Sequence, residues 1–398
     1  MRRIYLHERP DWPRFHWNQE ALANLLATVR YRQGRLIGRM MALDSDLRRE
    51  AVLRTLTEDV LKTSDIEGET LDPEQVRSSL ARHLGIDIGG PGHVDRNVEG
   101  IVRVMLDATS CYHLPLTAER LWDWRAWLFP DGDRGLGRIA TGSWRDDRTG
   151  PMQVVSGPVG HERVHFEAPP AERLDREMTR FLEWFNESDE MDGVLRAGLA
   201  HLWFVTIHPF EDGNGRIARA IADMALARSE QSPQRFYSMS SQIRKERTDY
   251  YKILEATQQG SMDVSVWMYW FLNCLKRAID GAETTLDAVL DKALFRERVA
   301  RFPLNERQHD VLTRLLDGFE GKLTTSKWAK LAKCSQDTAL RDIRELVEGG
   351  ILLRNPGGGR STSYKLADFA PPSGTEDDVE ADDPAAQDDP LGPVDTTQ

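Results

Sequence analysis

The apolar residues of this chain recur mostly with the spacing of α-helices. Residues 195–207 form an almost wholly apolar run of helical length, and further on Ile217, Ile221, Met224 and Ala225 recur three or four residues apart, a spacing that places them on one helix face. Helical patterns also cover residues 19–43, 47–67, 94–110, 117–129, 172–186, 241–258 and 264–299, with a break near Gly281 left open in the last. These patterns predict an all-α fold.

One segment departs from the helical pattern. Residues 152–156 and 163–167 are rich in strand-forming residues and flank Gly157-Pro158-Val159-Gly160, so they predict a β-hairpin. Because an isolated hairpin is marginally stable in water, we expect it to lie on the helical core.

The C-terminal part has a pattern of its own. Short helical stretches at residues 306–316, 325–331 and 336–347 precede two strands at 351–354 and 360–366, which flank a glycine-rich turn. This order predicts a winged helix-turn-helix. The chain is therefore expected to comprise an N-terminal helical region (1–110), a helical core (111–300), the winged helix-turn-helix (301–366) and a disordered acidic tail (367–398).

The charge of the chain is concentrated in that tail. The net charge is −12 over 398 residues, but residues 367–398 hold ten Asp or Glu and no Lys or Arg, which leaves −2 for the rest. Hence overall acidity says nothing about a nucleic-acid partner.

The first residues have no apolar signal region, no apolar run approaches the roughly 18 residues of a membrane span, and Cys111, Cys274 and Cys334 are far apart. A cytoplasmic protein is expected.

Most of the candidate catalytic and ligand-binding side chains lie at residues 208–219, where the predicted helix 195–207 is joined to the next one. Pro209 disfavours helix at His208, so the imidazole is expected where the first helix ends. Gly213 and Gly215 are expected in the turn, where their N–H groups can approach a ligand closely. The second helix then begins with its free N–H groups facing the same place, which predicts an anion site.

The side chains around this turn suit a phosphate-containing ligand. Arg216 and Arg219 lie on one helix face with Asp223 and can hold a polyphosphate by paired hydrogen bonds. Asp212 can hold Mg2+ together with phosphate oxygens, and His208 can accept a proton near neutral pH. Each residue alone has an ordinary structural explanation, but together they indicate a phosphoryl or nucleotidyl transferase.

This stretch, His-Pro-Phe-Glu-Asp-Gly-Asn-Gly-Arg-Ile-Ala-Arg, resembles the signature motif of the Fic family at every specified position. The resemblance implies an all-α Fic core with a β-hairpin flap that transfers AMP from ATP to a hydroxyl of a target protein. It implies that His208 is the general base and Asp212 the Mg2+ ligand. It assigns the α-phosphate side to Gly213, Asn214 and Gly215, and the β- and γ-phosphates to Arg216 and Arg219. The related Doc-like branch, which phosphorylates, has lysine at the place of Gly215.

Thr63-Ser64-Asp65-Ile66-Glu67-Gly68 resembles the inhibitory motif of the same family. The resemblance implies that Glu67 pairs with Arg219 and blocks productive ATP binding. Gly68 predicts a helix end, so Glu67 lies in the last turn, where the helix dipole disfavours a negative charge by about 0.3–1 kcal/mol. The alternative is a surface glutamate beside a helix cap.

Two further assignments rest on the resemblance. Val164, His165, Phe166 and Glu167 belong to the flap that docks a target segment by strand addition, with a purely structural hairpin as the alternative. Tyr250 and Tyr251 flank the adenine, with tyrosines buried at a helix contact as the alternative.

The leading interpretation is an autoinhibited, ATP- and Mg2+-dependent adenylyltransferase that modifies Ser, Thr or Tyr of a target protein or of itself. One alternative is the reverse reaction, a de-AMPylating phosphodiesterase in which Glu67 positions a water. Another is a DNA-binding regulator whose Fic site senses nucleotide, although a sensor needs no base such as His208.

Residues 303–366 carry eleven Lys or Arg against eight Asp or Glu. However, the third helix of this module also holds four acidic residues, Asp337, Asp342, Glu345 and Glu348, which weaken the case for DNA. Target docking or self-association through this module and a homodimer stay open.

Overall fold

The computed structural model describes residues 3–87, 94–130, 142–148, 150–158, 161, 163–187, 190–300, 302–316, 322–356 and 362–367. The chain divides into two compact units, Met1–Leu286 and Asp287–Gln398. The predicted acidic tail lies outside the described residues from position 368 onward.

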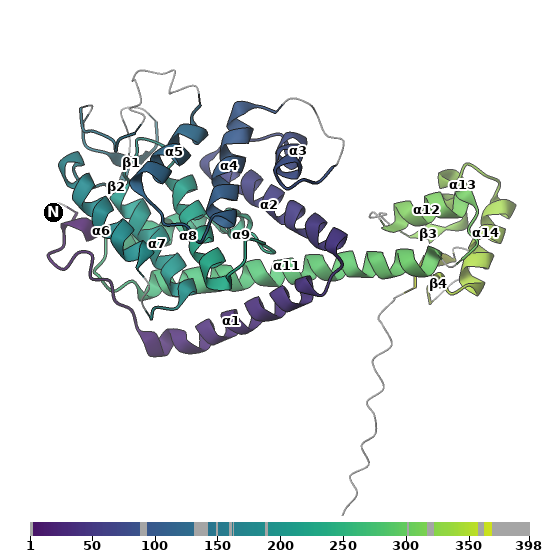
Figure 1. Cartoon of the computed structure of the whole chain (residues 1–398). Helices are drawn as coiled ribbons and strands as arrows, with labels where there is room; N and C mark the ends of the chain where they lie inside the picture. The colour runs from purple at the N-terminus through teal and green to yellow at the C-terminus, as the bar shows by residue number, and fades with distance from the viewer. Residues whose placement is uncertain are drawn as a thin grey trace, which may run out of the picture. The chain divides into compact units, whose positions relative to one another are not determined.

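Two central helices organise the first unit (Figure 1). They are α7 (Gly193–Ile207), in which every residue after the first is buried, and α8 (Asn214–Glu230), which packs along it. Around them lie η1 (Leu6–Glu8), α1 (Gln19–Met41), α2 (Ser45–Glu67), α3 (Pro73–His83), α4 (Arg96–Ser110), α5 (Ala118–Leu128), η2 (Ala171–Arg173), α6 (Leu174–Asn186), α9 (Met239–Lys245), α10 (Arg247–Gln258) and the start of α11 (Ser265–Ala300). The prediction of an all-α core is confirmed. Within the described part of the chain, every helix is too short or too polar to cross a bilayer.

The end of α2 follows the sequence signal, and α3 begins at a side-chain cap. Gly68 ends α2 with a φ of 87°, in the left-handed region that favours glycine. Asp72 then caps α3, because its carboxylate accepts the N–H groups of Glu74 and Gln75 at 2.9 and 3.3 Å. The predicted helix stop at Gly68 is therefore confirmed, and it places Glu67 in the last turn of α2.

One helix prediction needs correction, and a second point that the sequence left open is decided by the structure. Residues 241–258 do not form one helix, because the chain breaks at Glu246 between α9 and α10, where the carboxylate of Glu246 accepts bonds from Arg277 on α11. The break near Gly281 is absent, since α11 is continuous there. A glycine costs a helix about 1 kcal/mol, and ion pairs of α1 with Asp280 and Glu283, on either side of Gly281, hold this stretch in place.

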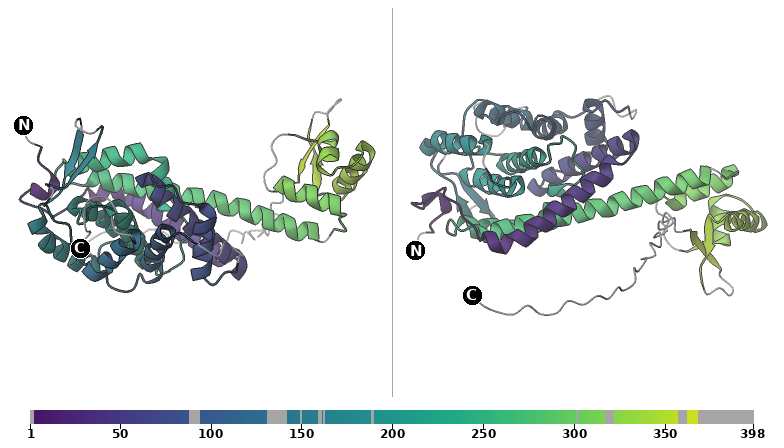
Figure 2. Two further views of the ribbon diagram at one scale, coloured as in Figure 1. Left: turned by 90° about the horizontal axis from the view of Figure 1, so that it is seen from above. Right: turned by 60° about the horizontal axis from the view of Figure 1, so that its bottom comes forward.

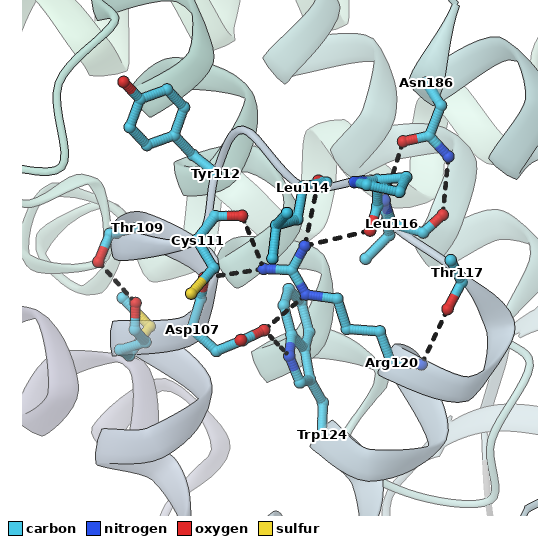
Figure 3. Close-up of polar contacts among 12 residues, drawn as sticks. Asp107, Thr109, Cys111, Tyr112, Leu114, Leu116, Thr117, Arg120, Trp124 and Asn186 are labelled. Carbon is cyan, nitrogen blue, oxygen red and sulfur yellow. Dashed lines mark hydrogen bonds and ion pairs between the residues drawn. The ribbon is translucent and has the colours of Figure 1, made fainter.

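The connection between α4 and α5 is fixed by Arg120 (Figure 3). Its Nε donates to Asp107 Oδ2 at 2.6 Å, and its Nη2 donates to the carbonyl oxygen of Cys111 at 3.1 Å. The indole N–H of the fully buried Trp124 donates to the same Asp107 oxygen at 2.6 Å. These bonds anchor α5, whose last turn leads to Phe129 beside the candidate site.

The predicted hairpin is confirmed as β1 (Gln153–Ser156) and β2 (Arg163–Glu167), paired antiparallel. Val154 lies opposite Phe166, and Val155 opposite Val164, so His165 has no partner residue on β1 and forms a bulge. The N-terminal segment lies beside the hairpin (Figure 2), with Tyr5 and the fully buried Phe166 in one apolar cluster.

The second unit is the predicted winged helix-turn-helix. It contains α12 (Glu306–Leu316), β3 (Leu323–Thr324), α13 (Thr325–Leu331), α14 (Gln336–Glu348), β4 (Leu352–Arg354) and β5 (Ser363–Leu366), around a core that includes Trp328 and Ile343. The sheet has the order β3-β5-β4, whereas the sequence predicted two strands. The missed strand, β3, has two residues, too few to show an alternating pattern.

Candidate functional site

The loop between α7 and α8 has a fixed conformation. His208 ends α7 with a φ of 53°, and Gly213 precedes α8 with a φ of 86°. The Asn214 side chain closes the loop, because its Oδ1 accepts the Phe210 N–H at 3.0 Å and its Nδ2 donates to the Phe210 carbonyl at 2.7 Å. Gly215 is the second residue of α8, so the prediction that it lies in the turn is wrong.

Arg145 holds this loop from outside. Its Nε donates to the His208 carbonyl at 2.8 Å, its Nη2 to the Pro169 carbonyl at 2.5 Å, and its backbone N–H to the Pro209 carbonyl at 2.9 Å. With 4% of its surface exposed, Arg145 ties His208 to the segment that follows the hairpin.

A cavity of about 740 Å³ opens in front of the loop, within the range of about 300–1,000 Å³ typical of small-molecule sites. The structure brings most of the predicted site residues to its wall: Glu67, His165, Phe166, His208, Asp212, Gly213, Asn214, Gly215, Tyr250 and Tyr251. Val164 and Glu167 of the hairpin, and both signature arginines, do not line it.

Both arginines form ion pairs with carboxylates, Arg219 with Glu67 at the end of α2 and Arg216 with Glu69 just after it. Arg219 Nη2 lies 2.7 Å from Glu67 Oε1, and its Nε donates to Thr63 Oγ1 at 2.7 Å. Arg216 Nη1 lies 2.7 Å from Oε2 of Glu69, a residue that sequence reasoning missed. Asp223 lies apart from the cavity and pairs with Arg235 at 3.1 Å.

Both guanidinium groups have unused donors. Only 5% of the Arg216 side chain and 2% of the Arg219 side chain are exposed. Within the described residues, Arg216 Nε and Arg219 Nη1 are buried without a hydrogen-bond partner. Because buried donors without partners are costly, this end of the site is suited to binding more negative charge than the two carboxylates supply.

His208 is set up as a neutral base. Burial lowers its pKa from 6.5 to about 4, and the charge of Arg145 acts in the same direction, against the opposing effects of the Val205 carbonyl, Glu67 and Asp212. Its Nδ1 lies 3.2 Å from the Val205 carbonyl oxygen. Since a carbonyl only accepts, Nδ1 carries the proton and Nε2 keeps a free lone pair.

The two tyrosines differ in their surroundings. Tyr250 is buried, its hydroxyl lies 2.9 Å from His201 Nε2, and burial raises its pKa. Tyr251 is 37% exposed, with the Arg247 guanidinium 5.3 Å from its ring centre. Both rings line the cavity, so Tyr251 offers an accessible aromatic wall and Tyr250 supports it from behind.

A metal ion at this site would need oxygen atoms of a bound phosphate in addition to the protein carboxylate. Asp212 is exposed, and its Oδ1 accepts the Gly213 N–H at 2.5 Å. In the described ranges, no three His, Cys, Asp or Glu side chains are grouped to hold a metal. This donor set fits Mg2+, which is usually bound by one or two carboxylates together with phosphate oxygens and water.

Comparison with known proteins gives three family matches. Residues 115–226 match the Fic/DOC family, residues 5–86 a domain of unknown function (DUF4172), and residues 307–365 a DeoR-like helix-turn-helix domain.

Curated relatives are named protein adenylyltransferase Fic. The protein from Nematostella vectensis is 34% identical over 125 residues, which are 30% of this chain and 27% of that protein. The protein from Drosophila ananassae is 27% identical over 280 residues, which are 66% of this chain and 51% of that protein. The chain thus spans about half or less of the length of these relatives.

Solved structures are similar as well. A Fic family protein from Desulfovibrio desulfuricans G20 is 24% identical with a TM-score of 0.48, and the match covers 89% of this chain and 98% of that chain. Fic-1 from C. elegans is 21% identical with a TM-score of 0.47, covering 68% of this chain and 74% of that chain.

Proposed function

Because residues 115–226 match the Fic/DOC family, we propose that this chain is a protein adenylyltransferase that moves AMP from ATP to a Ser, Thr or Tyr hydroxyl. The observation that carries the proposal is the pairing of two features at one site. His208 Nε2 is a free, neutral base, and Arg216 and Arg219 present buried donors without partners. The target is another protein or the chain itself.

The proposed reaction is a substitution at the α-phosphorus of ATP. His208 Nε2 takes the proton of the acceptor hydroxyl, the hydroxyl oxygen forms a bond to the α-phosphorus, and the bond to the β-phosphate oxygen breaks with release of pyrophosphate. The N–H groups at the start of α8, at Gly213, Asn214 and Gly215, face the α-phosphate side. Arg216 and Arg219 receive the β- and γ-phosphates. Asp212 would hold Mg2+, which supplies neutralisation of phosphate charge.

We further propose that Glu67 keeps the enzyme inactive. Its carboxylate lies 2.7 Å from Arg219 Nη2, and there it occupies the space beside Gly215 through which a γ-phosphate would reach the same guanidinium. Tyr250 and Tyr251 form the adenine side, and the hairpin that contains Val164, His165, Phe166 and Glu167 docks the target by strand addition.

The experiment is mass spectrometry of purified Glu67→Gly protein after incubation with Mg2+ and ATP, beside wild type and Glu67→Gly/His208→Ala. An AMP-sized addition on a hydroxyl side chain in the single variant, absent from the double, supports both the chemistry and the inhibition. A phosphate-sized addition would indicate attack on the γ-phosphate instead. If wild type removes AMP from the modified Glu67→Gly protein, the reverse reaction is the better description.

DNA binding by the second unit is a second candidate function, because one acidic residue of α14, Asp342, is buried and a second, Glu345, is hydrogen-bonded within the unit. Only 1% of the Asp342 side chain is exposed, and it pairs with Arg307 at 3.1 Å. Glu345 accepts a bond from Gln308 at 2.9 Å. On the same helix Arg341 and Arg344 are exposed, so the face of α14 is more basic than its composition indicates.

The test is binding of the full chain to duplex DNA in a mobility-shift titration at two salt concentrations. Arg341→Ala and Arg344→Ala, singly and together, should weaken binding and flatten its salt dependence, whereas Arg314→Ala on α12 is the charge-matched control for each single variant. Binding that is absent at low salt would remove this candidate.

A further inference from the structure

Helices α2 and α8 meet along a stripe of polar residues that spans three helical turns. Asp59, Thr63 and Glu67 are four residues apart on α2 and therefore share one face. Glu67 Oε1 and the Thr63 carbonyl oxygen lie 2.7 and 2.9 Å from Arg219 Nη2. One helical turn away on both helices, Asp59 contacts Asp223. The proposed inhibitory contact of Glu67 thus lies at one end of the stripe, and a pair of aspartates lies at the other.

The two aspartates are buried. Asp59 is 4% exposed and Asp223 is 2% exposed. Asp223 Oδ1 accepts from Arg235 Nη2 at 3.1 Å, but its Oδ2 has no hydrogen-bond partner in the part of the chain that the structure describes. Asp59 Oδ1 accepts the Ser240 N–H at 3.2 Å and also the Ser238 hydroxyl. Because two carboxylates that share one site repel each other, one of them keeps its proton, and this proton supplies the partner that Asp223 Oδ2 lacks.

The charges next to the pair favour this proton further. Glu230 is a third buried carboxylate, and it and Asp223 both pair with Arg235 at 3.1 Å. If all three carboxyl groups were ionised, one guanidinium would have to balance three buried negative charges, which is costly. Burial and the charge of Asp59 accordingly raise the pKa of Asp223 well above its ordinary value, against the opposing charge of Arg235.

The other groups packed around the pair do not balance it. Tyr237 donates to Glu230, and burial raises the pKa of this tyrosine, which keeps it protonated. Glu58 on α2 accepts a serine hydroxyl of α9 at 2.5 Å, which adds no positive charge. The buried residues of α4 and α9, which also contact α2 and α8, are uncharged. From α7, His201 lies near Arg219 and is neutral, because burial lowers its pKa to about 3.

The end of α2 depends on polar contacts to stay docked. From position 59 onward, this helix buries three polar side chains, Asp59, Thr63 and Ser64, beside only two apolar ones, Val60 and Ile66. When α2 moves away, both aspartates reach water and regain the ordinary pKa of about 3.9. Docked α2 therefore binds one proton more than displaced α2 at pH values between this pKa and the raised one. Over that range, docking weakens by up to about tenfold per pH unit.

On the premise of the adenylyl transfer and inhibition proposed above, we propose that Asp59 and Asp223 form a proton-binding site that holds α2 on α8. Loss of the shared proton releases the end of α2, and with it Glu67 from Arg219. Inhibition is therefore strong in acid and weakens as the pH rises. The ligand of this site is the proton itself, and the site is separate from the cavity, which neither aspartate lines.

The first experiment compares the rates of AMP incorporation by wild type and by Glu67→Gly between about pH 5.5 and pH 8. The ratio of the two rates reports the inhibition, because effects of pH on the chemical step cancel. In wild type this ratio should rise by up to about tenfold per pH unit. Asp59→Asn should keep it low and flat, because the amide can donate to Asp223 at every pH and so replaces the shared proton. Asp46→Asn, an acid on α2 whose side chain is 88% exposed, is the charge control and should behave like wild type.

Asp223→Asn is the reciprocal variant. It keeps an oxygen acceptor for Arg235 and leaves Asp59 without a facing charge, so it should also give a low, flat ratio. Because the two variants change opposite helices, each of them tests the site if the other does not fold.

Two measurements on the same proteins need no AMP transfer. Unfolding in urea releases the shared proton, so the unfolding constant of wild type should rise by up to about tenfold per pH unit relative to that of Asp59→Asn. Hydrogen exchange locates the change along the chain. At about pH 8 the amides of residues 59–67 should exchange faster in wild type than in Asp59→Asn, and at about pH 5.5 the two proteins should agree.

The outcomes separate this proposal from the adenylyl transfer itself. Equal pH dependence of unfolding in wild type and in both asparagine variants would overturn the shared proton. A flat rate ratio in wild type, or equal exchange of the α2 amides at about pH 8, would overturn its control of Glu67. Absence of incorporation by Glu67→Gly at every pH would instead count against the adenylyltransferase, while unfolding and hydrogen exchange still decide the proton site.

Discussion

Gly215 and Glu67 share one space in this protein. A Cβ built on Gly215 would lie 2.2 Å from Glu67 Oε1 and 3.3 Å from Arg219 Nη1. The absence of a side chain at position 215 is therefore what lets the glutamate reach the arginine. In the proposed catalytic state, the same space admits a phosphate.

This relationship predicts that Gly215→Ala breaks the Glu67–Arg219 pair without activating the enzyme. The flexible end of Glu67 must move, but the new methyl group also occupies the approach of the phosphate, so AMP incorporation should stay near the wild-type level. Alanine favours the helix by about 0.5–1 kcal/mol, which offsets part of the loss of the bond to Arg219, whose side chain is only 2% exposed. The free energy of unfolding in urea should thus fall by up to about 2 kcal/mol. Incorporation as high as in Glu67→Gly would show that the methyl group leaves room for the phosphate.

The second carboxylate leads to a separate prediction. Glu69 lies 2.7 Å from Arg216, and 46% of its side chain is exposed, so the pair is worth up to about 1 kcal/mol. Glu69→Gln should therefore tighten ATP binding by up to about fivefold, and Glu67→Gly/Glu69→Gln should bind ATP more tightly than Glu67→Gly alone. Titration calorimetry measures both, with Glu74→Gln, an exposed acid on α3, as the charge control. Equal affinities of the single and double Glu67 variants would remove Glu69 from the inhibition.

The sequence predicted the features that depend on neighbours along the chain. Gly68 as a helix stop, His208 at the end of α7 and the hairpin are all local signals, and the structure has them. The break at Glu246 was missed because its cause is a contact with Arg277 on another helix.

The supporting contacts of the site could not be predicted, because they join distant segments. Glu69 is 147 residues from Arg216, Arg145 is 63 residues from His208, and His165 is 90 residues from Glu255. None of these pairs has a spacing that a motif records. The acidic count of α14 was also misleading, since burial of Asp342 removes a charge that composition alone assigns to the surface.

The pKa of His208 predicts how AMP transfer depends on pH. Because burial lowers it to about 4, the imidazole is already neutral at about pH 5, and transfer by Glu67→Gly should not fall between about pH 8 and pH 5.5 through His208. The charge of Glu67 raises the pKa of His208. The Glu67→Gly substitution therefore lowers this pKa further and moves the fall in rate to a lower pH. Initial rates at saturating ATP and Mg2+ measure the profile, with circular dichroism at each pH as the control. A half-maximal rate near the ordinary histidine pKa of about 6.5 would contradict a His208 imidazole that is neutral over this range.

Arg145 supports the last prediction, since one buried guanidinium fixes the loop carbonyl of His208 and the Pro169 carbonyl at once. Lysine keeps the charge but cannot direct planar donors to both acceptors. Arg145→Lys should therefore destabilise the fold by about 1–3 kcal/mol and, in the Glu67→Gly background, lower the rate of AMP transfer by about tenfold or more. ATP affinity should stay within about twofold, because Arg145 does not line the cavity. Urea unfolding, initial rates and calorimetry on the same preparation separate these effects. A loss of ATP affinity equal to the loss of rate would show that Arg145 supports the nucleotide site rather than the placement of His208.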